Sequence, residues 1–413
     1  MSARVCIVTS GHLATCPRML KAADALAGAG YGVRVVSARY MPWAAAADRD
    51  LAATRPWAWT VVDYDRQSAP RTYLRTGARA RLARALCRAI GPARAPLGLA
   101  ARAASRVHPE LVRAATAEPA DLIYGGTSGA LAAAAEAARR RRVPYALDLE
   151  DFHSAEQTDA SARILDRLNG RIERGVLAGA AFLTVSSAAI AAAYQRTYGL
   201  DPIVVHNTFP LPARPPDAAP TSGDRLRLYW FSQTIGPGRG LEDAVQAMGI
   251  AGLPGELHLR GLPADGYLDA LAALQQRVAP QLRIVHHPPA APDQMIELSR
   301  PYDVGLVLEA PLSRNRELCL ANKALVYPLA GLAVALTDTP GHRPLAADLG
   351  AGALVYRSGD VQALADGLAR WAADKALLAR GRSAAWQAAR RRWHWEDPAE
   401  RGALLAAVAG AVA

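Results

Sequence analysis

The chain has 413 residues, of which 51% are hydrophobic, so it is long enough for two to three domains with sizeable cores. Its four cysteines lie far apart without a CxxC pair, which excludes a disulfide framework and disfavours a zinc site. The formal net charge is +11. Residues 4–9 are typical of a first strand and not of a signal peptide, and no apolar run is long enough to span a bilayer. We therefore expect a cytoplasmic protein that can attach peripherally to the inner face of a membrane.

Apolar strand-like runs and helical segments alternate through the first half of the chain. This alternation predicts a doubly wound parallel sheet. The expected strands span residues 5–9, 33–37, 61–62, 122–124, 145–149, 182–185 and 203–205. The expected helices span residues 16–29, 129–142, 164–177 and 188–198.

A proline-rich stretch at residues 207–225 interrupts the pattern and predicts a linker. The alternation resumes with expected strands at residues 226–231, 256–260, 282–286, 304–308, 332–337 and 354–356. We expect an α/β protein with two Rossmann-like doubly wound domains facing a cleft. The predicted division is an N-terminal domain at 1–206, the linker at 207–225, a C-terminal domain at 226–392 and a helical segment at 393–413 that packs back on the first domain.

The positive charge is concentrated between Arg66 and Arg113. This segment holds eleven arginines and one acidic residue, Glu110, a net charge of 11 − 1 = +10. A basic amphipathic helix of this kind indicates an anionic membrane surface or a phosphate-bearing partner, and a merely solvated helical face is the alternative. Nucleic acid is not expected, because Tyr73 is the only aromatic residue available for stacking.

The most informative stretch runs from Glu309 to Arg343 and reads as loop, short helix, glycine turn, buried strand and polar glycine loop. Asn322 and Lys323 open the helix, where unpaired N–H groups and the helix dipole favour a bound anion. Gly331 closes the helix, and Pro328 inside it predicts a short or kinked helix. An ordinary βαβ unit with a solvated lysine is the alternative on these residues alone.

Strand ends of the second domain supply the other candidate ligands. Arg239 follows a glycine-rich turn and would flank a diphosphate with Lys323, the arginine by bidentate bonding and the lysine as a point charge. The residues that we expect to surround this anionic ligand are Gly11, Ser232, Gln233, Thr234, Arg239, Gly240, His287, Asn322, Lys323 and Gly341.

His153 is the candidate for chemistry in the first domain, because it follows Asp148, Glu150 and Asp151 at a strand end. Neighbouring carboxylates raise the pKa of a histidine and allow it to donate or shuttle a proton. Two alternatives stay open: Asp151 or Ser154 caps the next helix, or the acids bind a metal ion.

Five segments carry a resemblance to a known family: YWFSQTIGPGRGLEDAVQAM, NKALVYPLAGLAVALTDTPG, YALDLEDFHS, FLTVSS and IVVHN. Together they resemble GT-B-fold glycosyltransferases of family 4, the "glycosyl transferases group 1" type. The resemblance implies an enzyme that moves a sugar, with retention, from a nucleotide sugar to a glycan or lipid-linked acceptor in polysaccharide biosynthesis. It also implies that no metal or other cofactor is needed.

The resemblance assigns roles to residues of this chain. Arg239 and Lys323 match the cations that hold the donor diphosphate in the C-terminal domain, and His153 matches a position near the transferred sugar. The expected catalytic residues are His153, from this match, and Glu309 and Glu317, which are the nearest acids to the family's catalytic positions. The expected acceptor-binding residues are Arg18, Gly126 and Asp151.

The sequence departs from the family pattern at its paired glutamates. The family positions fall on Leu318 and Val326, and Glu309 and Glu317 are the nearest acids that could replace them. Gln233-Thr234 likewise stands where the family has a Gly-Arg pair. A sugar-nucleotide-binding protein without transferase activity, and a GT-B epimerase or hydrolase, are therefore the competing hypotheses.

Overall fold

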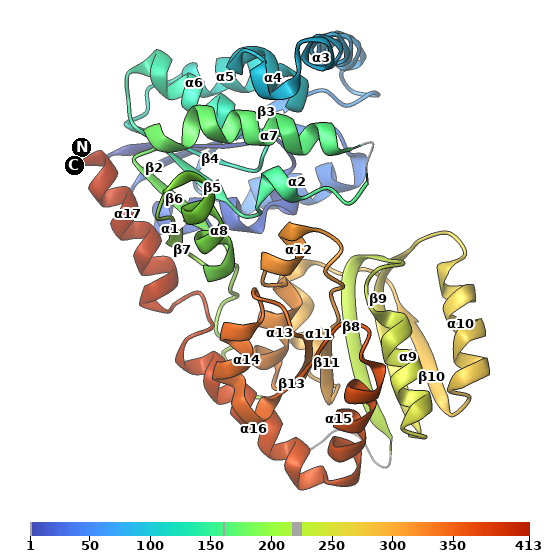
Figure 1. Cartoon of the computed structure of the whole chain (residues 1–413). Coiled ribbons are helices and arrows are strands. Elements are labelled where there is room, and N and C mark those ends of the chain that lie inside the picture. Colours follow the sequence, from blue (N-terminus) through green and yellow to red (C-terminus); the bar gives the residue numbers. More distant parts are fainter. Residues whose placement is uncertain (1, 160–161, 217–224) are drawn as a thin grey trace. The chain divides into compact units, whose positions relative to one another are not determined.

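A computed structural model describes residues 2–159, 162–216 and 225–413. The chain divides into two compact units (Figure 1). The first comprises Met1–His206 and Arg401–Ala413, and the second comprises Asn207–Glu400. Among the described helices, none combines the length and the apolar character needed to span a bilayer.

The first unit is built on a seven-stranded parallel sheet with the order β3-β2-β1-β4-β5-β6-β7. Its central strands are buried on both faces, as expected for a parallel sheet covered by helices. The strands are β1 (Arg4–Thr9), β2 (Gly32–Arg39), β3 (Ala58–Asp63), β4 (Leu122–Gly126), β5 (Tyr145–Leu149), β6 (Phe182–Val185) and β7 (Ile203–Val204).

Helices cover both faces of this sheet (Figure 1). One layer contains α4 (Leu97–Ala104), α5 (His108–Thr116), α6 (Leu131–Arg141) and α7 (Arg163–Val176). The other contains α1 (Pro17–Gly28) and α8 (Ala188–Tyr198), and the last helix of the chain, α17 (Ala403–Val412), packs against α1 and β6. Two further helices are α2 (Pro42–Thr54) and α3 (Pro70–Ile90), and α3 packs on the outside of α4.

The second unit is built on a six-stranded parallel sheet with the order β10-β9-β8-β11-β12-β13. Both sheets reverse their strand order next to the first strand of the unit, which is the topological switch point where open α/β sheets bind ligands. The strands are β8 (Leu226–Ile235), β9 (Gly255–Pro263), β10 (Leu282–His287), β11 (Val304–Val307), β12 (Ala333–Thr337) and β13 (Ala353–Tyr356).

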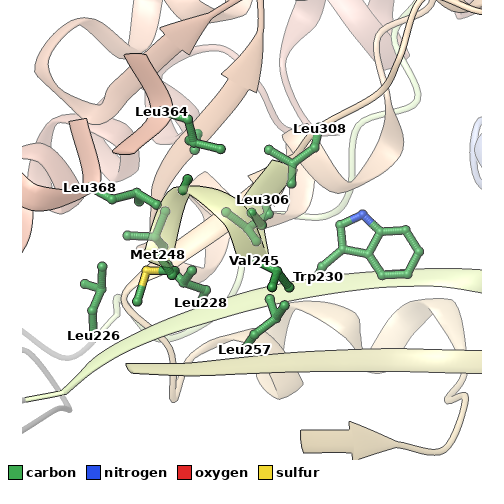
Figure 2. Packing of buried hydrophobic residues seen from close by; sticks show 14 of the residues in the cluster. Leu226, Leu228, Trp230, Val245, Met248, Leu257, Leu306, Leu308, Leu364 and Leu368 are labelled. Carbon is green, nitrogen blue, oxygen red and sulfur yellow. The ribbon is translucent and has the colours of Figure 1, made fainter. Parts of the chain in front are cut away.

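The helices of the second unit enclose two apolar clusters. They are α9 (Leu241–Ile250), α10 (Tyr267–Val278), α11 (Met295–Ser299), α12 (Arg314–Leu318), α13 (Asn322–Ala330), α14 (Arg343–Leu349), α15 (Val361–Ala373) and α16 (Lys375–Arg391). Figure 2 shows one cluster, in which Val245 and Met248 of α9 and Leu364 and Leu368 of α15 meet the leucines of β8 and β11. This packing fixes the strand ends that carry the polar residues described below.

The predicted fold class is confirmed: the chain contains two Rossmann-like parallel α/β units. Two local predictions are wrong. The strand expected to end at Phe231 continues to Ile235 after an irregularity in its pairing with β9, so Ser232 to Thr234 belong to a strand. The expected loop after Glu309 contains the short helix α12, which Ser313 caps with its hydroxyl group.

Candidate functional site

The carboxyl ends of β8 and β11 in the second unit and the first turn of α13 carry a cluster of charged side chains. Glu309 follows β11, Arg239 precedes α9, and Lys323 lies in the first turn of α13. One Glu309 carboxylate oxygen accepts from the Lys323 ammonium group, and the other lies 3.5 Å from Arg239. The two cations predicted to flank a diphosphate are thus brought together on one carboxylate.

Burial and charge together set the ionisation of this cluster. Burial alone would raise the pKa of Glu309, but Lys323, Arg239 and Arg316 outweigh it and lower the pKa to about 2. Burial and repulsion by Arg239 lower the pKa of Arg316, which also donates to the Gly238 carbonyl at 3.1 Å. Three cations therefore surround one carboxylate, a formal charge of 3 − 1 = +2.

The ammonium group of Lys323 is held on a second side by an aromatic ring. It lies 5.2 Å from the centroid of the Trp230 ring, and the lysine is 7% exposed. The ion pair and the cation–π contact together fix the position of this charge. The opening turn of α13 adds its unpaired N–H groups at the same place.

Two glycines near the cluster allow close backbone packing. Gly240 has φ +71°, and a Cβ there would lie 2.3 Å from the Leu308 carbonyl oxygen. A Cβ at Gly341 would lie 2.3 Å from the Cys319 carbonyl oxygen, and the Gly341 amide donates to the Glu317 carbonyl at 3.1 Å. A side chain at either position would push apart the loops that carry the charges.

The other predicted residues of the second unit have contacts outside this cluster. Asn322 accepts from the amide of Asn207 at 3.0 Å, and Glu317 pairs with Arg314 on α12.

His287 lies 2.9 Å from His258, and burial followed by repulsion from Arg260 lowers the pKa of His287. Ser232 and Gln233 form the irregular part of β8 and Thr234 resumes its pairing with β9; Gln233 and Thr234 are exposed. Their assigned roles remain predictions.

His342 is a polar residue near this site that the sequence reasoning did not select. Its Nδ1 lies 3.0 Å from the Thr337 carbonyl, so this nitrogen carries the hydrogen. Its Nε2 is buried and has no hydrogen-bond partner among the described residues. Burial lowers the pKa of His342, which keeps the ring neutral and leaves Nε2 as an acceptor. Its isolated position in the sequence gave no signal of this.

In the first unit, His153 lies at the carboxyl end of β5 beside acidic side chains. Its Nδ1 is 3.3 Å from Glu156, and its Nε2 is buried without a hydrogen-bond partner in the described chain. Burial would lower the pKa of His153, but Glu156 and Asp151 reverse this effect and raise it to about 9. The imidazole is therefore a cation at neutral pH.

The alternative readings of His153 can be compared with this geometry. The short 3-10 turn His153–Ala155 begins without a side-chain cap, so the structure gives the capping alternative no support there. Ligand-type atoms of Asp151, His153 and Glu156 lie within 4.8 Å of one another and could hold a metal ion. A protonated imidazole cannot ligate a metal, so the ion would first have to displace that proton.

Glu150 is a second titratable group at the same strand end. Burial, followed by repulsion from Asp151, raises the pKa of Glu150 to about 7. A carboxyl group that titrates near neutrality beside a histidine cation can exchange a proton with a substrate. The run of acidic residues in the sequence indicates a carboxyl group with a shifted pKa here, but the sequence does not show which of these residues is buried.

The predicted acceptor-binding residues have clear internal roles. Arg18 is buried and binds both carboxylate oxygens of Asp148, with its Nε at 2.8 Å, and also donates to the Val205 carbonyl. A Cβ at Gly126 would lie 2.3 Å from the sulfur of Met19, so this glycine lets α1 approach β4. Gly11, by contrast, faces open space, and a Cβ there would meet nothing within 4 Å.

Comparison with solved structures places the fold. The chain is similar to HepE from Anabaena in complex with UDP and glucose, with 16% identity, a TM-score of 0.69 and 98% of each chain covered. It is similar to sucrose-phosphate synthase from Thermosynechococcus elongatus, with 15% identity, a TM-score of 0.65 and coverage of 98% of this chain and 97% of that one. TarM from S. aureus, in complex with Fondaparinux, alpha-GlcNAc-glycerol and UDP, gives 8% identity, a TM-score of 0.67 and 99% coverage of both chains.

These similarities span almost the whole chain and define a GT-B fold. No protein-family profile matches the sequence, and no curated protein matches it. At such low identities the comparison shows the fold alone, so the function must be argued from the residues.

Proposed function

We propose that the protein is a glycosyltransferase that transfers a sugar from a nucleotide sugar to an acceptor. The observation that carries the proposal is the cluster of Arg239, Arg316 and Lys323 around Glu309, at the carboxyl edge of the second sheet. Its formal charge of +2 suits a diphosphate, and it lies beside the first turn of α13, which favours an anion.

The cations would act on the leaving group. When the bond between sugar and diphosphate breaks, negative charge develops on the diphosphate, and fixed positive groups stabilise it without reorganisation. Lys323 is held in place by Glu309 and Trp230, and the more exposed Arg239 can bind phosphate oxygens through two N–H groups. Solved structures of HepE and TarM with the same fold contain UDP, which makes UDP the first donor fragment to test.

We assign the acceptor to the first unit, where His153, Asp151 and Glu150 lie at the end of β5. His153 is positively charged at neutral pH and would stabilise negative charge near the transferred sugar, while Glu150 can exchange a proton. In line with the family resemblance, we propose a family 4 enzyme that retains anomeric configuration and uses a glycan or lipid-linked acceptor. A peripheral membrane location and a mechanism without a metal ion belong to the same proposal.

A second candidate is a protein that binds sugar nucleotides without transferring the sugar. The specific observation behind it is that the family's paired glutamates fall on Leu318 and Val326, which are 1% and 0% exposed. These side chains belong to the apolar interior and cannot contact a ribose or sugar hydroxyl group. If Glu309 and Glu317 do not take over the roles of the family's paired glutamates, the protein would bind a sugar nucleotide without catalysing transfer.

A thermal-shift screen of nucleoside diphosphates and their sugars tests the binding step, because a ligand at 100 times its Kd stabilises a protein by about 2.7 kcal/mol. The matched pair is Arg239→Gln and Arg277→Gln, which remove the same charge from the cluster and from the exposed side of α10. We expect the shift to be lost only in the first variant. If the wild type shows no shift with any nucleotide, the proposal is wrong.

The catalytic step is tested by release of nucleoside diphosphate with a panel of glycan and lipid-linked acceptors, in the presence of EDTA. Acceptor-dependent release supports a transferase that needs no metal. Free sugar formed without an acceptor would identify a hydrolase, and an isomerised sugar nucleotide would identify an epimerase. Binding without any turnover would favour the second candidate.

A further inference from the structure

Helix α3 carries two apolar stripes on opposite faces. Thr76, Ala80, Ala83 and Cys87 follow one another at helical spacing and are buried. The second stripe follows the same spacing through Leu74, Ala78, Leu82, Ala85 and Ala89, and these residues are exposed. A helix packed on one neighbour needs only one apolar stripe, so the second calls for a separate explanation.

The inner face of α3 is firmly attached to the first unit. Its small residues pack on α4, whose Ala100, Ala101 and Ala103 are buried. Glu110 of α5 pairs with Arg79 and lies 3.2 Å from Arg75, and Arg84 donates to the Ala103 carbonyl at 2.8 Å. Figure 1 shows that α3 lies on the outside of α4. The contacts above fix the rotation of the helix, and the second stripe is left exposed.

The outer face combines large apolar side chains with arginines. Leu74 and Leu82 are 65% and 63% exposed, and Leu86 and Ile90 are each 45% exposed. The exposed arginines on the same helix are Arg71, Arg75, Arg81 and Arg88. The helix has six arginines and no acidic residue. Single exposed leucines are common, but a row of them at helical spacing indicates an interaction surface.

We propose that the outer face of α3, defined by Leu74, Leu82 and Leu86 with the flanking arginines, docks on an anionic lipid bilayer. The leucines would enter the boundary between headgroups and acyl chains, and the arginines would bind lipid phosphates. This inference rests on the peripheral membrane location proposed above and names the residues and the orientation of the attachment. Vesicle binding is measured without any substrate, so its failure can be told apart from a failure of sugar transfer.

Charge and side-chain chemistry select the bilayer over other occupants. A second copy of α3 would bring six more arginines against the first six, which is repulsive. A soluble polyanion such as RNA would use the arginines, but it offers nothing for the leucines. Only a surface that is both anionic and apolar below its charges matches both sets of residues.

Sedimentation of the full chain with vesicles tests the proposal. We expect binding to phosphatidylcholine vesicles that contain phosphatidylglycerol, weak binding to phosphatidylcholine alone, and release at high salt. The Leu82→Glu/Leu86→Glu variant should bind at least about tenfold more weakly, because it removes the apolar area that the two leucines would bury in the bilayer. The Arg81→Gln/Arg88→Gln variant should bind about 30-fold more weakly at low salt. It removes two basic residues, and each usually contributes about a factor of five at an anionic surface.

Matched controls separate the α3 face from general charge and hydrophobicity. Arg139→Gln/Arg141→Gln removes two exposed arginines from the end of α6, and Ile250→Glu/Val355→Glu places two acids at exposed apolar positions of the second unit. Both should bind like the wild type. Leu82→Ala/Leu86→Ala keeps a strong helix former and should give an intermediate loss with an unchanged Tm.

Four results would overturn the proposal. Equal binding to neutral and anionic vesicles, or an equal loss of vesicle binding in the control variants, would show that the α3 face is not what binds the bilayer. A dimer in solution that dissociates in the Leu82→Glu/Leu86→Glu variant would assign the face to a second copy. Retention on a soluble polyanion without any vesicle binding would assign it to that partner.

Discussion

Each unit buries a cation against a carboxylate at the carboxyl edge of its sheet, but the two pairs differ in what surrounds them. Arg18 grips both oxygens of Asp148 and a backbone carbonyl, and Thr184 donates to the same carboxylate at 2.6 Å. Lys323 instead shares Glu309 with Arg239, whose side chain is 30% exposed. The first pair is closed and balanced, whereas the second is part of a cluster with excess positive charge.

The comparison separates a structural ion pair from a site that can accept a ligand. The three guanidinium nitrogens of Arg18 all donate to the protein, and the side chain is buried, so little of it is left for a substrate. A carboxylate that holds three cations in place leaves net positive charge facing outward. The predictions below test this distinction, beginning with the largest expected effect.

Arg18→Ala should lower the free energy of unfolding by about 3–5 kcal/mol, because Asp148 would stay buried without its partner. Urea denaturation measures this change. Arg196→Ala, which removes an exposed arginine from α8 in the same unit, should change stability by no more than about 0.5 kcal/mol. Similar small effects for both variants would show that the Arg18 pair is not a structural element.

Lys323→Ala should cost about 2–4 kcal/mol of transition-state stabilisation, the usual effect of losing one preorganised charge-stabilising group. The rate of nucleoside diphosphate release under saturating donor measures it, with the folded fraction confirmed by circular dichroism. Lys375→Ala, at an exposed lysine of α16, is the control. Unchanged turnover in the Lys323 variant would contradict the role of the cluster in leaving-group stabilisation.

Arg239→Gln should weaken nucleoside diphosphate binding by about 1.5–3 kcal/mol, the range for hydrogen bonds to a charged group. Because Arg239 is partly exposed and Lys323 still neutralises Glu309, stability should change by less than about 1 kcal/mol. Isothermal titration calorimetry compares this variant with Arg277→Gln. A loss of stability without a loss of nucleoside diphosphate affinity would show that Arg239, like Arg18, belongs to a structural ion pair.

The pH dependence of stability gives the smallest effect, at most about 1.4 kcal/mol per pH unit for one proton. The pKa of Glu309 is lowered to about 2 in the folded state, so its stabilisation is complete above the unfolded value near 4.5. It is lost as the pH falls through that window toward 2. Glu309→Gln should remove this part of the acid dependence in urea titrations at successive pH values, and an unaltered profile would mean that Glu309 is not held ionised by the cations.

Much of the fold follows from the sequence because its signals are local. Buried parallel strands are continuous apolar runs, and the segments 145–149, 182–185 and 332–337 were recognised for this reason. The shortness of α13, with Pro328 inside and Gly331 at its end, also followed from local rules. The extension of β8 does not follow from the sequence, because Ser232, Gln233 and Thr234 are polar and the strand resumes its pairing with β9 only at Thr234 and Ile235.

The site was less predictable, because its arrangement depends on contacts between distant segments. The sequence pointed to Arg239, Glu309 and Lys323 one by one, but not to their convergence on a single carboxylate. Arg18 resembled a ligand-binding residue until its partners in β5 and at Val205 were known. Arg316 and His342 carried no pattern of their own, since the positions of α12 and of the loop before α14 come from packing between distant segments.

The return of α17 to the first unit has a consequence for biosynthesis. The surface of α1 and β6 that Leu404 and Val408 cover cannot be completed until the ribosome has made the intervening second unit. At a synthesis rate of about 5–20 residues per second, that delay lasts on the order of 10–40 s. During this interval the nascent first unit lacks the cover that Leu404 and Val408 of α17 provide.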